Sequence, residues 1–82
     1  MAYTPELIAE LDILALYNLD NHQEGLKVHN NASNRAQLAI TRLHEKGLVT
    51  QADGGYLTSL GLDAAEHAQA LLTILRTEPA RA

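Results

Sequence analysis

The segment from Ala36 to Leu62 restricts the possible folds more than any other part of the chain. It opens with apolar residues at the i, i+3, i+4 and i+7 spacing that lines one face of a helix: Ala36, Ala39, Ile40 and Leu43. Gly47 can adopt the left-handed conformation that ends such a helix. The Asp53-Gly54 pair is a strong hairpin signal, and Thr58 can cap a further helix. The order is therefore helix, hairpin, helix.

The first helix of this segment is expected over residues 33–46. Ser33 can cap it by accepting a hydrogen bond from a free backbone amide, and Asn34 with Gln37 forms an alternative cap one residue later. Lys46 places a positive charge at the negative end of the helix dipole. The side opposite the apolar face is mostly polar.

A β-hairpin is expected over about residues 48–58. Residues 48–51 favour an extended strand, and residues 52–55 must reverse the chain because they contain the Asp-Gly signal. Side chains alternate on the returning strand, which directs Leu57 to the core and Tyr56 to the flank.

The last helix is expected over residues 59–76. Its apolar stripe comprises Ala65, Ala68, Leu72 and Leu75, with Leu71 beside it. The small alanines allow a neighbouring helix to approach closely. Pro79 prevents further helix, so residues 77–82 are expected to form a mobile tail.

A helix over about residues 4–19 is expected to open the chain. Thr4 can cap it, and Pro5 takes the first helical position, where its missing amide costs nothing. The apolar residues that follow are so dense that this helix must be covered on more than one side: Leu7, Ile8, Leu11, Ile13, Leu14, Leu16 and Leu19.

Residues 20–32 give a weaker signal. Asp20 and Gln23 fit a capping box, which favours a short helix over about residues 22–29. Gly25 opposes this helix, because glycine inside a helix costs about 1 kcal/mol relative to alanine. The asparagines that follow suit a tight turn.

Length and composition bound the architecture. With 82 residues, 46% of them hydrophobic, the chain can bury one core, and we expect a single domain over residues 1–82 that is mainly α-helical with a small β-hairpin. The chain has no cysteine, which excludes a disulfide framework and a thiolate metal site. The N-terminus lacks a signal-peptide pattern, and no apolar run reaches the roughly 20 residues that cross a bilayer. A cytoplasmic protein without membrane contact is expected.

Four histidines are spread along the chain: His22, His29, His44 and His67. No two of them stand four residues apart on one predicted helix, and no cysteine accompanies them, so we predict no metal site. The sequence also lacks a nucleophile-with-base spacing and a glycine-rich phosphate loop. We therefore expect neither a cofactor nor an enzymatic activity.

Three stretches of the chain resemble the helix-to-wing segment of bacterial winged helix-turn-helix regulators: Ala39–Leu43, Glu45–Val49 and Gly54–Thr58. The resemblance covers about residues 20–75. It implies that residues 33–46 form a recognition helix. It also implies that the hairpin is the wing, with these residues at its tip and flank: Gln51, Asp53, Gly54, Gly55 and Tyr56.

The chain is also similar to a small uncharacterised bacterial family of comparable length. This similarity rests on Tyr3–Leu7 at the start and on Asp53–Thr58 in the hairpin. The family implies no activity. The chain departs from the usual winged-helix pattern because its wing carries no basic residue.

The expected recognition helix carries the side chains that could contact DNA: Ser33, Asn34, Arg35, Gln37, Thr41, Arg42 and Lys46. Arginine and lysine neutralise phosphates, while asparagine and glutamine can read adenine edges. An ordinary solvated helix face and helix capping explain the same residues. The charge balance opposes DNA binding, since six basic side chains stand against ten acidic ones, and Asp53 is at the wing tip.

Two functions remain open. The first is a DNA-binding regulator or accessory factor that acts on double-stranded DNA as a homodimer, because two copies double the phosphate contacts. The candidate interface lies on the last helix, together with the N-terminal helix, and its residues could equally belong to the core: Ala64, Ala68, Leu71, Leu72 and Leu75. The second is a protein-interaction module on the same scaffold, without nucleic-acid binding.

Overall fold

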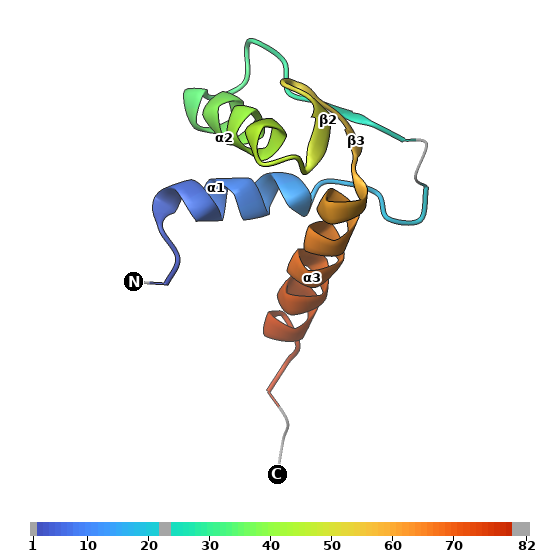
Figure 1. Ribbon diagram of the computed structural model, residues 1–82. Coiled ribbons are helices and arrows are strands. Elements are labelled where there is room, and N and C mark those ends of the chain that lie inside the picture. Colours follow the sequence, from blue (N-terminus) through green and yellow to red (C-terminus); the bar gives the residue numbers. More distant parts are fainter. Residues whose placement is uncertain (1, 22–23, 80–82) are drawn as a thin grey trace.

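The computed structural model describes residues 2–21 and 24–79. The elements follow one another as α1 (Pro5–Leu14), β1 (Leu26–Lys27), α2 (Asn34–Glu45), β2 (Val49–Gln51), β3 (Gly54–Leu57) and α3 (Ser59–Leu75). The strands form one antiparallel sheet in the order β1-β3-β2. Figure 1 shows α2 stacked on α1 with the hairpin beside α2, while α3 points away from both. The fold is mainly helical and has a winged-helix-like layout.

All three helices begin at the caps that the sequence predicts. The hydroxyl of Thr4 accepts a hydrogen bond from the amide of Leu7 at 3.2 Å. Ser33 does the same for the amide of Ala36 at 3.1 Å, so the serine and not the following asparagine caps α2. Thr58 caps α3 and also donates to the carbonyl of Gly47 at 2.6 Å, which ties the start of α3 to the end of α2.

The hairpin also forms where the turn signal predicts it. Gly54 and Gly55 have φ angles of 131° and 75°, in the left-handed region that favours glycine. The backbone passes so close to β1 that a Cβ atom on Gly54 would lie 2.2 Å from the carbonyl oxygen of Leu26. The predicted helices over 33–46 and 59–76 and the hairpin over 48–58 are thus confirmed, to within one or two residues at their ends.

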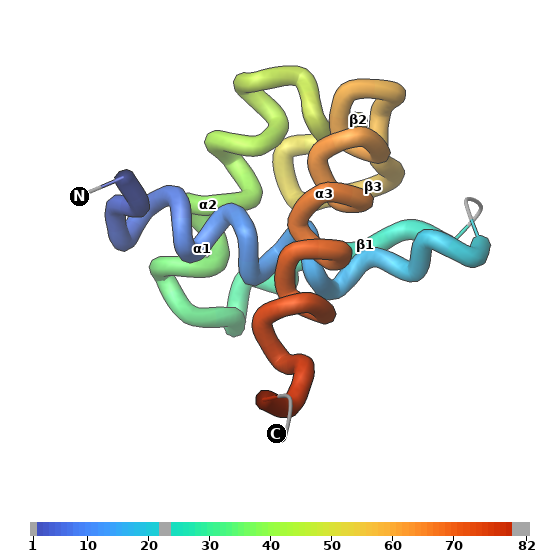
Figure 2. The backbone as a smooth tube through the Cα atoms, turned by 90° about the horizontal axis from the view of Figure 1, so that it is seen from below, coloured from blue at the N-terminus to red at the C-terminus, as the bar shows by residue number. Residues whose placement is uncertain are grey.

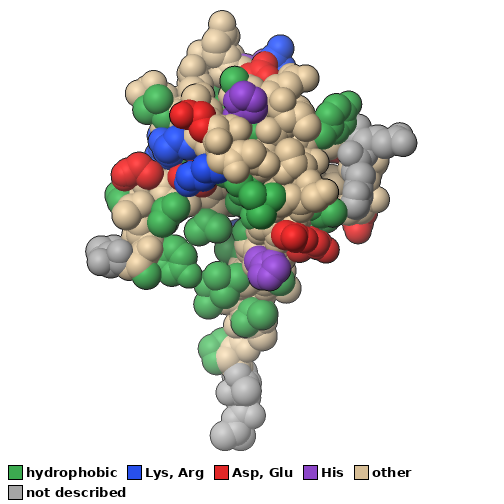
Figure 3. Space-filling model, in the orientation of Figure 1, with side chains coloured by type: hydrophobic (Ala, Val, Ile, Leu, Met, Phe, Trp, Pro, Cys, Tyr) green, Lys and Arg blue, Asp and Glu red, His purple; other side chains and the backbone are tan. Residues whose placement is uncertain are grey.

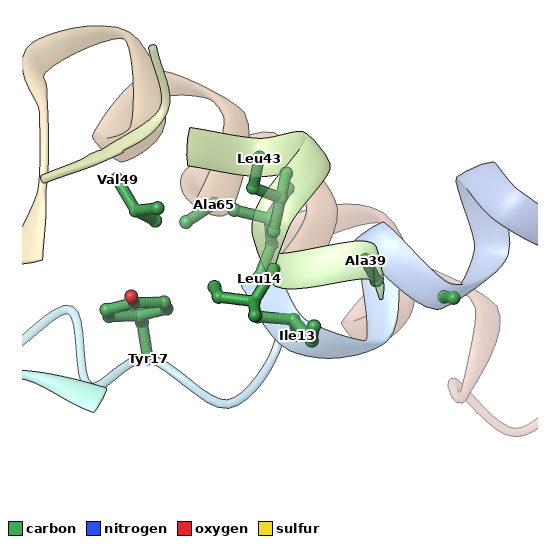
Figure 4. Close-up of a cluster of buried hydrophobic side chains, with 9 residues drawn as sticks. Ile13, Leu14, Tyr17, Ala39, Leu43, Val49 and Ala65 are labelled. Atoms are coloured by element: carbon green, nitrogen blue, oxygen red, sulfur yellow. The ribbon is translucent and has the colours of Figure 1, made fainter. Parts of the chain in front are cut away.

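The core lies where α1, α2, β2 and α3 meet (Figure 4). Its buried apolar residues are Ala9, Ile13, Leu14, Tyr17, Ala39, Ile40, Leu43, Val49 and Ala65. Ile40 and Leu43 are the largest side chains that are fully buried, which fits the apolar face predicted for α2. Leu57 packs against this cluster, as the alternation on its strand predicts.

The first helix is shorter than predicted. We expected it to reach residue 19, but α1 ends at Leu14 with Ala15 as its cap. Tyr17 leaves the helix to enter the core, and its hydroxyl donates to the carbonyl of Gly55 at 3.4 Å. Gln69 of α3 donates to the carbonyls of Leu14 and Tyr17, at 3.1 and 2.8 Å. Tertiary hydrogen bonds therefore satisfy the backbone groups that a longer helix would have used.

The helix predicted over residues 22–29 is wrong for the part that the structure describes. Residues 22 and 23 lie outside the described residues, and with them half of the predicted capping box. Leu26 and Lys27 form β1, which pairs with Gly55 and Gly54 of β3. Gly25 permits this pairing, because a Cβ atom there would meet the carbonyl oxygen of Gly55 at 3.0 Å. A strand and a turn therefore stand where a helix-turn-helix would have its first helix.

The end of the chain is described only in part. Residues 77–79 follow α3 without a helix or strand, and residues 80–82 of the predicted tail lie outside the described residues.

Candidate interaction surfaces

The outward face of α2 lies opposite the core, and of the seven residues that the sequence proposes for DNA contact only Asn34 and Thr41 lie on it. Opposite the buried residues, the helix period places four exposed residues there: Asn34, Leu38, Thr41 and Glu45. Leu38 is 52% exposed. All of α2 is described, and this face carries neither lysine nor arginine.

The cations of α2 lie on its flank, toward α1. Arg42 donates from Nε to Oε2 of Glu10 at 3.2 Å and from Nη2 to the carbonyl of Glu6 at 3.1 Å. Lys46 pairs through Nζ with the other oxygen of Glu10. Arg35 approaches Asp12, with 3.7 Å between Nη1 and Oδ2. In Figure 3 blue and red side chains accordingly lie next to one another over the α1–α2 boundary.

Glu10 explains why the fold needs Arg42 and Lys46. It is a carboxylate that is only 5% exposed, and a buried charge is tolerated only when it is paired and hydrogen-bonded. Arg42 and Lys46 supply one partner for each of its two oxygens. Arg42 and Lys46 thus already pair with a carboxylate of α1, which competes with any contact to a DNA phosphate.

Two uncharged polar residues of α2, Gln37 and Thr41, also have partners within the chain. Gln37 donates from Nε2 to the carbonyls of Asn30 and Ala32, at 3.1 and 2.7 Å, and so fixes the loop that precedes the helix. The Thr41 hydroxyl donates to the carbonyl of Gln37 at 3.0 Å. Together with Ser33, which serves as the cap, these contacts give most of the predicted DNA-contacting residues a structural role.

Groups of the wing also form hydrogen bonds within the chain. The carbonyl of Asp53 accepts from the amide of Val28 at 2.7 Å, and Gly55 accepts from Tyr17. Burial raises the pKa of the Tyr17 phenol, which keeps this donor protonated. Tyr56 is exposed, and its amide donates to the Thr50 hydroxyl at 2.9 Å. The tip of the wing offers a carboxylate side chain and backbone rather than cations.

A polar hollow lies between β1, α2 and the wing. It brings together Gln37, Thr41 and Asp53 with residues that sequence reasoning did not single out for a surface: Lys27, His29 and Asn30. The sequence did not indicate these residues because it predicted a helix over 22–29, whereas only the extended path of β1 puts Lys27 beside the wing.

An apolar groove separates α1 from α3. Its walls are Tyr3, Ile8, Leu11, Asp12 and Ala15 on one side and Ala68, Leu71, Leu72 and Leu75 on the other. In Figure 3 green side chains gather below α1 and along α3. Figures 1 and 2 both show the second half of α3 extending away from the rest of the chain. Leu75, at its end, is 70% exposed.

A model of DUF5669, a family of unknown function, matches residues 1–76, which include every helix and strand described above. The chain belongs to DUF5669. Comparison with curated proteins gives no match, and neither does comparison with solved structures. The expectation of a small uncharacterised family is therefore confirmed.

In this DUF5669 chain, four of the five predicted interface residues line the groove, while Ala64 packs against the core. The sequence indicated that the N-terminal helix takes part, but not through which residues. Its apolar residues are so dense that periodicity does not separate Ile8 and Leu11 from the buried side.

The described part of the DUF5669 chain offers neither a metal site nor a membrane-spanning helix. Within residues 2–21 and 24–79, no group of three His, Cys, Asp or Glu side chains is placed to hold a metal ion. His22 lies outside these residues, and His67 has Nδ1 at 2.7 Å from the carbonyl oxygen of Asp63 in its own helix. The helices within the described residues are too short or too polar to cross a membrane.

Proposed function

We propose that this chain is a protein–protein interaction module that uses the groove between α1 and α3. The observation that carries the proposal is the exposed apolar stripe on a helix that projects from the core. Leu71 and Leu75 are exposed and line the groove, and Ile8, also exposed, lines its other side. Contiguous apolar surface of this kind usually marks a binding site.

Burial of the exposed leucines at the end of α3 would stabilise a complex. Covering an exposed leucine or isoleucine contributes about 1.5–3 kcal/mol when the burial is complete. In the isolated chain this contribution is incomplete at the end of α3, where Leu71 is 42% and Leu75 70% exposed. A partner that covers the groove would bury these side chains and gain the corresponding free energy.

The charge distribution supports a protein partner over a nucleic acid. DNA affinity comes largely from neutralised phosphates, and this chain has a net charge of −4. Arg42 and Lys46 are held by Glu10, and the outward face of α2 ends in the carboxylate of Glu45.

A photo-reactive amino acid tests the proposal. It replaces Leu75 in the groove or, as the matched control, Leu38 on the outward face of α2, since both leucines are more than half exposed. We expect irradiation in the native host to give a discrete protein adduct at position 75 and none at position 38. No adduct at position 75 would overturn the proposed function.

DNA binding through α2 is the second candidate. The observation in its favour is the layout. The sheet has the strand order β1-β3-β2, and its hairpin lies beside α2. Two partly exposed cations, Arg35 in α2 and Lys46 at its C-terminal cap, lie on this helix. Random-sequence duplex DNA, added at low salt, should then shift backbone amide resonances of residues 33–46 and the hairpin. These shifts should vanish as salt is added. Unchanged resonances at high micromolar DNA would eliminate this candidate.

A further inference from the structure

We propose that the groove between α1 and α3 is filled by α3 of a second copy of this chain, running antiparallel to the first. The inference rests on the proposed function and names its partner. It follows from two features of the groove: the order of small and large residues along α3, and the opposite charges of α1 and of the end of α3.

The side chains on the groove side of α3 become larger toward the C-terminal end of the helix. Ala68 lines the groove near the middle of α3, and Leu71 and Leu75 follow it on the same stripe toward the end of the helix. Antiparallel pairing can place Leu75 of each copy against Ala68 of the other, so that a large side chain fills the space left by a small one. Parallel pairing would set Ala68 against Ala68 and Leu75 against Leu75, without this match of sizes.

This size match also fixes the symmetry axis. If Leu75 of one copy lies opposite Ala68 of the other, the midpoint falls between Leu71 and Leu72. A two-fold axis there makes every contact occur twice. Both central leucines line the groove, so the centre of the interface is apolar.

The charges favour the same direction. The end of α1 and the middle of α3 are held together where Gln69 donates to the carbonyl of Leu14, so α1 meets α3 near Ala68. In the antiparallel pair, the C-terminal end of the second α3 therefore arrives at α1. That end carries Arg76, the one lysine or arginine within residues 59–76, whereas the charged residues of α1 are all acidic.

Asp12 is the acidic residue that the groove presents to this arginine. It is the charged member of the groove lining, and its side chain is 66% exposed. Its existing partner, Arg35, is 3.7 Å away and also exposed, so a second cation can share the carboxylate. We assign Asp12 and Arg76 of the opposite copy as a pair at the rim of the interface.

The oligomeric state is the first test. Sedimentation of the full chain over a concentration series should show a monomer–dimer equilibrium. Leu75→Asp should weaken the dimer by about tenfold or more, because it places a charge in the apolar contact. Leu38→Asp, an equally drastic change on an exposed leucine of α2, should leave the equilibrium unchanged.

A charge exchange tests the orientation. Asp12→Arg and Arg76→Asp should each weaken the dimer, since each sets like charges against one another. The variant that carries both changes should regain most of the wild-type affinity. Additive weakening in the double variant would contradict the antiparallel arrangement.

Cysteines offer an independent readout, because the chain has none of its own. Leu71→Cys, next to the axis, should form a disulfide-linked dimer under mild oxidation. Leu75→Cys should not, because the two copies of this position lie at opposite ends of the interface. Adding Ala68→Cys to Leu75→Cys should restore the crosslink. Crosslinking by Leu75→Cys alone would indicate parallel helices.

The two proposals fail in different ways. A chain that stays monomeric but gives a photo-adduct with another protein at position 75 would retain the proposed function and refute self-pairing. A monomeric chain without any adduct at position 75 would refute both. A dimer that Leu75→Asp leaves intact would use a different surface and would overturn this inference.

Discussion

Helices α2 and α3 leave very different surfaces. Each is amphipathic and each places alanines in the core, but α2 also buries its larger apolar residues other than Leu38, while α3 leaves Leu71, Ile74 and Leu75 exposed. The polar side chains of α2 bind other parts of the chain, through Glu10 and the loop before the helix. A resemblance to a recognition helix therefore does not make α2 a free surface. The uncommitted surface is that of α3.

The largest expected effect contrasts two leucines on opposite sides of α2. Leu43→Ala removes a side chain that is fully buried, and we expect the free energy of unfolding to fall by about 2–5 kcal/mol. Leu38→Ala, on the outward face, should change it by no more than about 0.5 kcal/mol. Urea unfolding measures both. Equal losses would mean that the outward face of α2 is not a surface at all.

Arg42 provides the next test, of whether the cations of α2 serve the fold. Arg42→Ala leaves the buried Glu10 carboxylate with Lys46 alone, and we expect a loss of about 1–2 kcal/mol, reduced from that of a fully buried pair because the arginine is partly exposed. Arg35→Ala breaks an exposed pair and is the matched control, with an expected loss below about 0.5 kcal/mol. If the two variants unfold alike, Arg42 is as free as a DNA contact would need to be.

Gln37 extends the same question to an uncharged side chain. Gln37→Ala removes two hydrogen bonds to the loop carbonyls of Asn30 and Ala32, which should destabilise the chain by about 1 kcal/mol. Hydrogen exchange of the amides in residues 28–33 should also become faster. Unaltered exchange would return Gln37 to the set of residues available for binding.

The smallest expected effect lies on α3. Leu75→Ala, measured at a protein concentration low enough to keep the chain monomeric, should change the free energy of unfolding by less than about 0.5 kcal/mol, because this leucine has little to pack against within its own chain. At high concentration the same variant should lose stability relative to the wild type, since dimerisation stabilises the folded state. A large loss in the monomer would place Leu75 in the core and end the contrast between the two helices.

Sequence reasoning succeeded wherever neighbours along the chain decide the structure. The caps Thr4, Ser33 and Thr58, the Gly54 turn and the apolar face of α2 were all predicted and are confirmed. It failed at the end of α1 and at β1. There, continuing a helix was locally reasonable, but Tyr17 and Gly25 meet partners that lie far along the sequence.

The sequence by itself determined the three helix starts, the hairpin and the apolar stripe of α3, because these depend on side-chain period and on hydrogen bonds spanning a few residues. Only the tertiary structure decided which polar groups are free. Glu10 meets Arg42 and Lys46 more than thirty positions away, and β1 pairs with a strand at a similar separation. Such pairings form only when the core brings the elements together, so the spacing of apolar residues along the sequence does not predict them. For that reason α2 looked like a binding face in the sequence, whereas the structure leaves the groove beside α3 open.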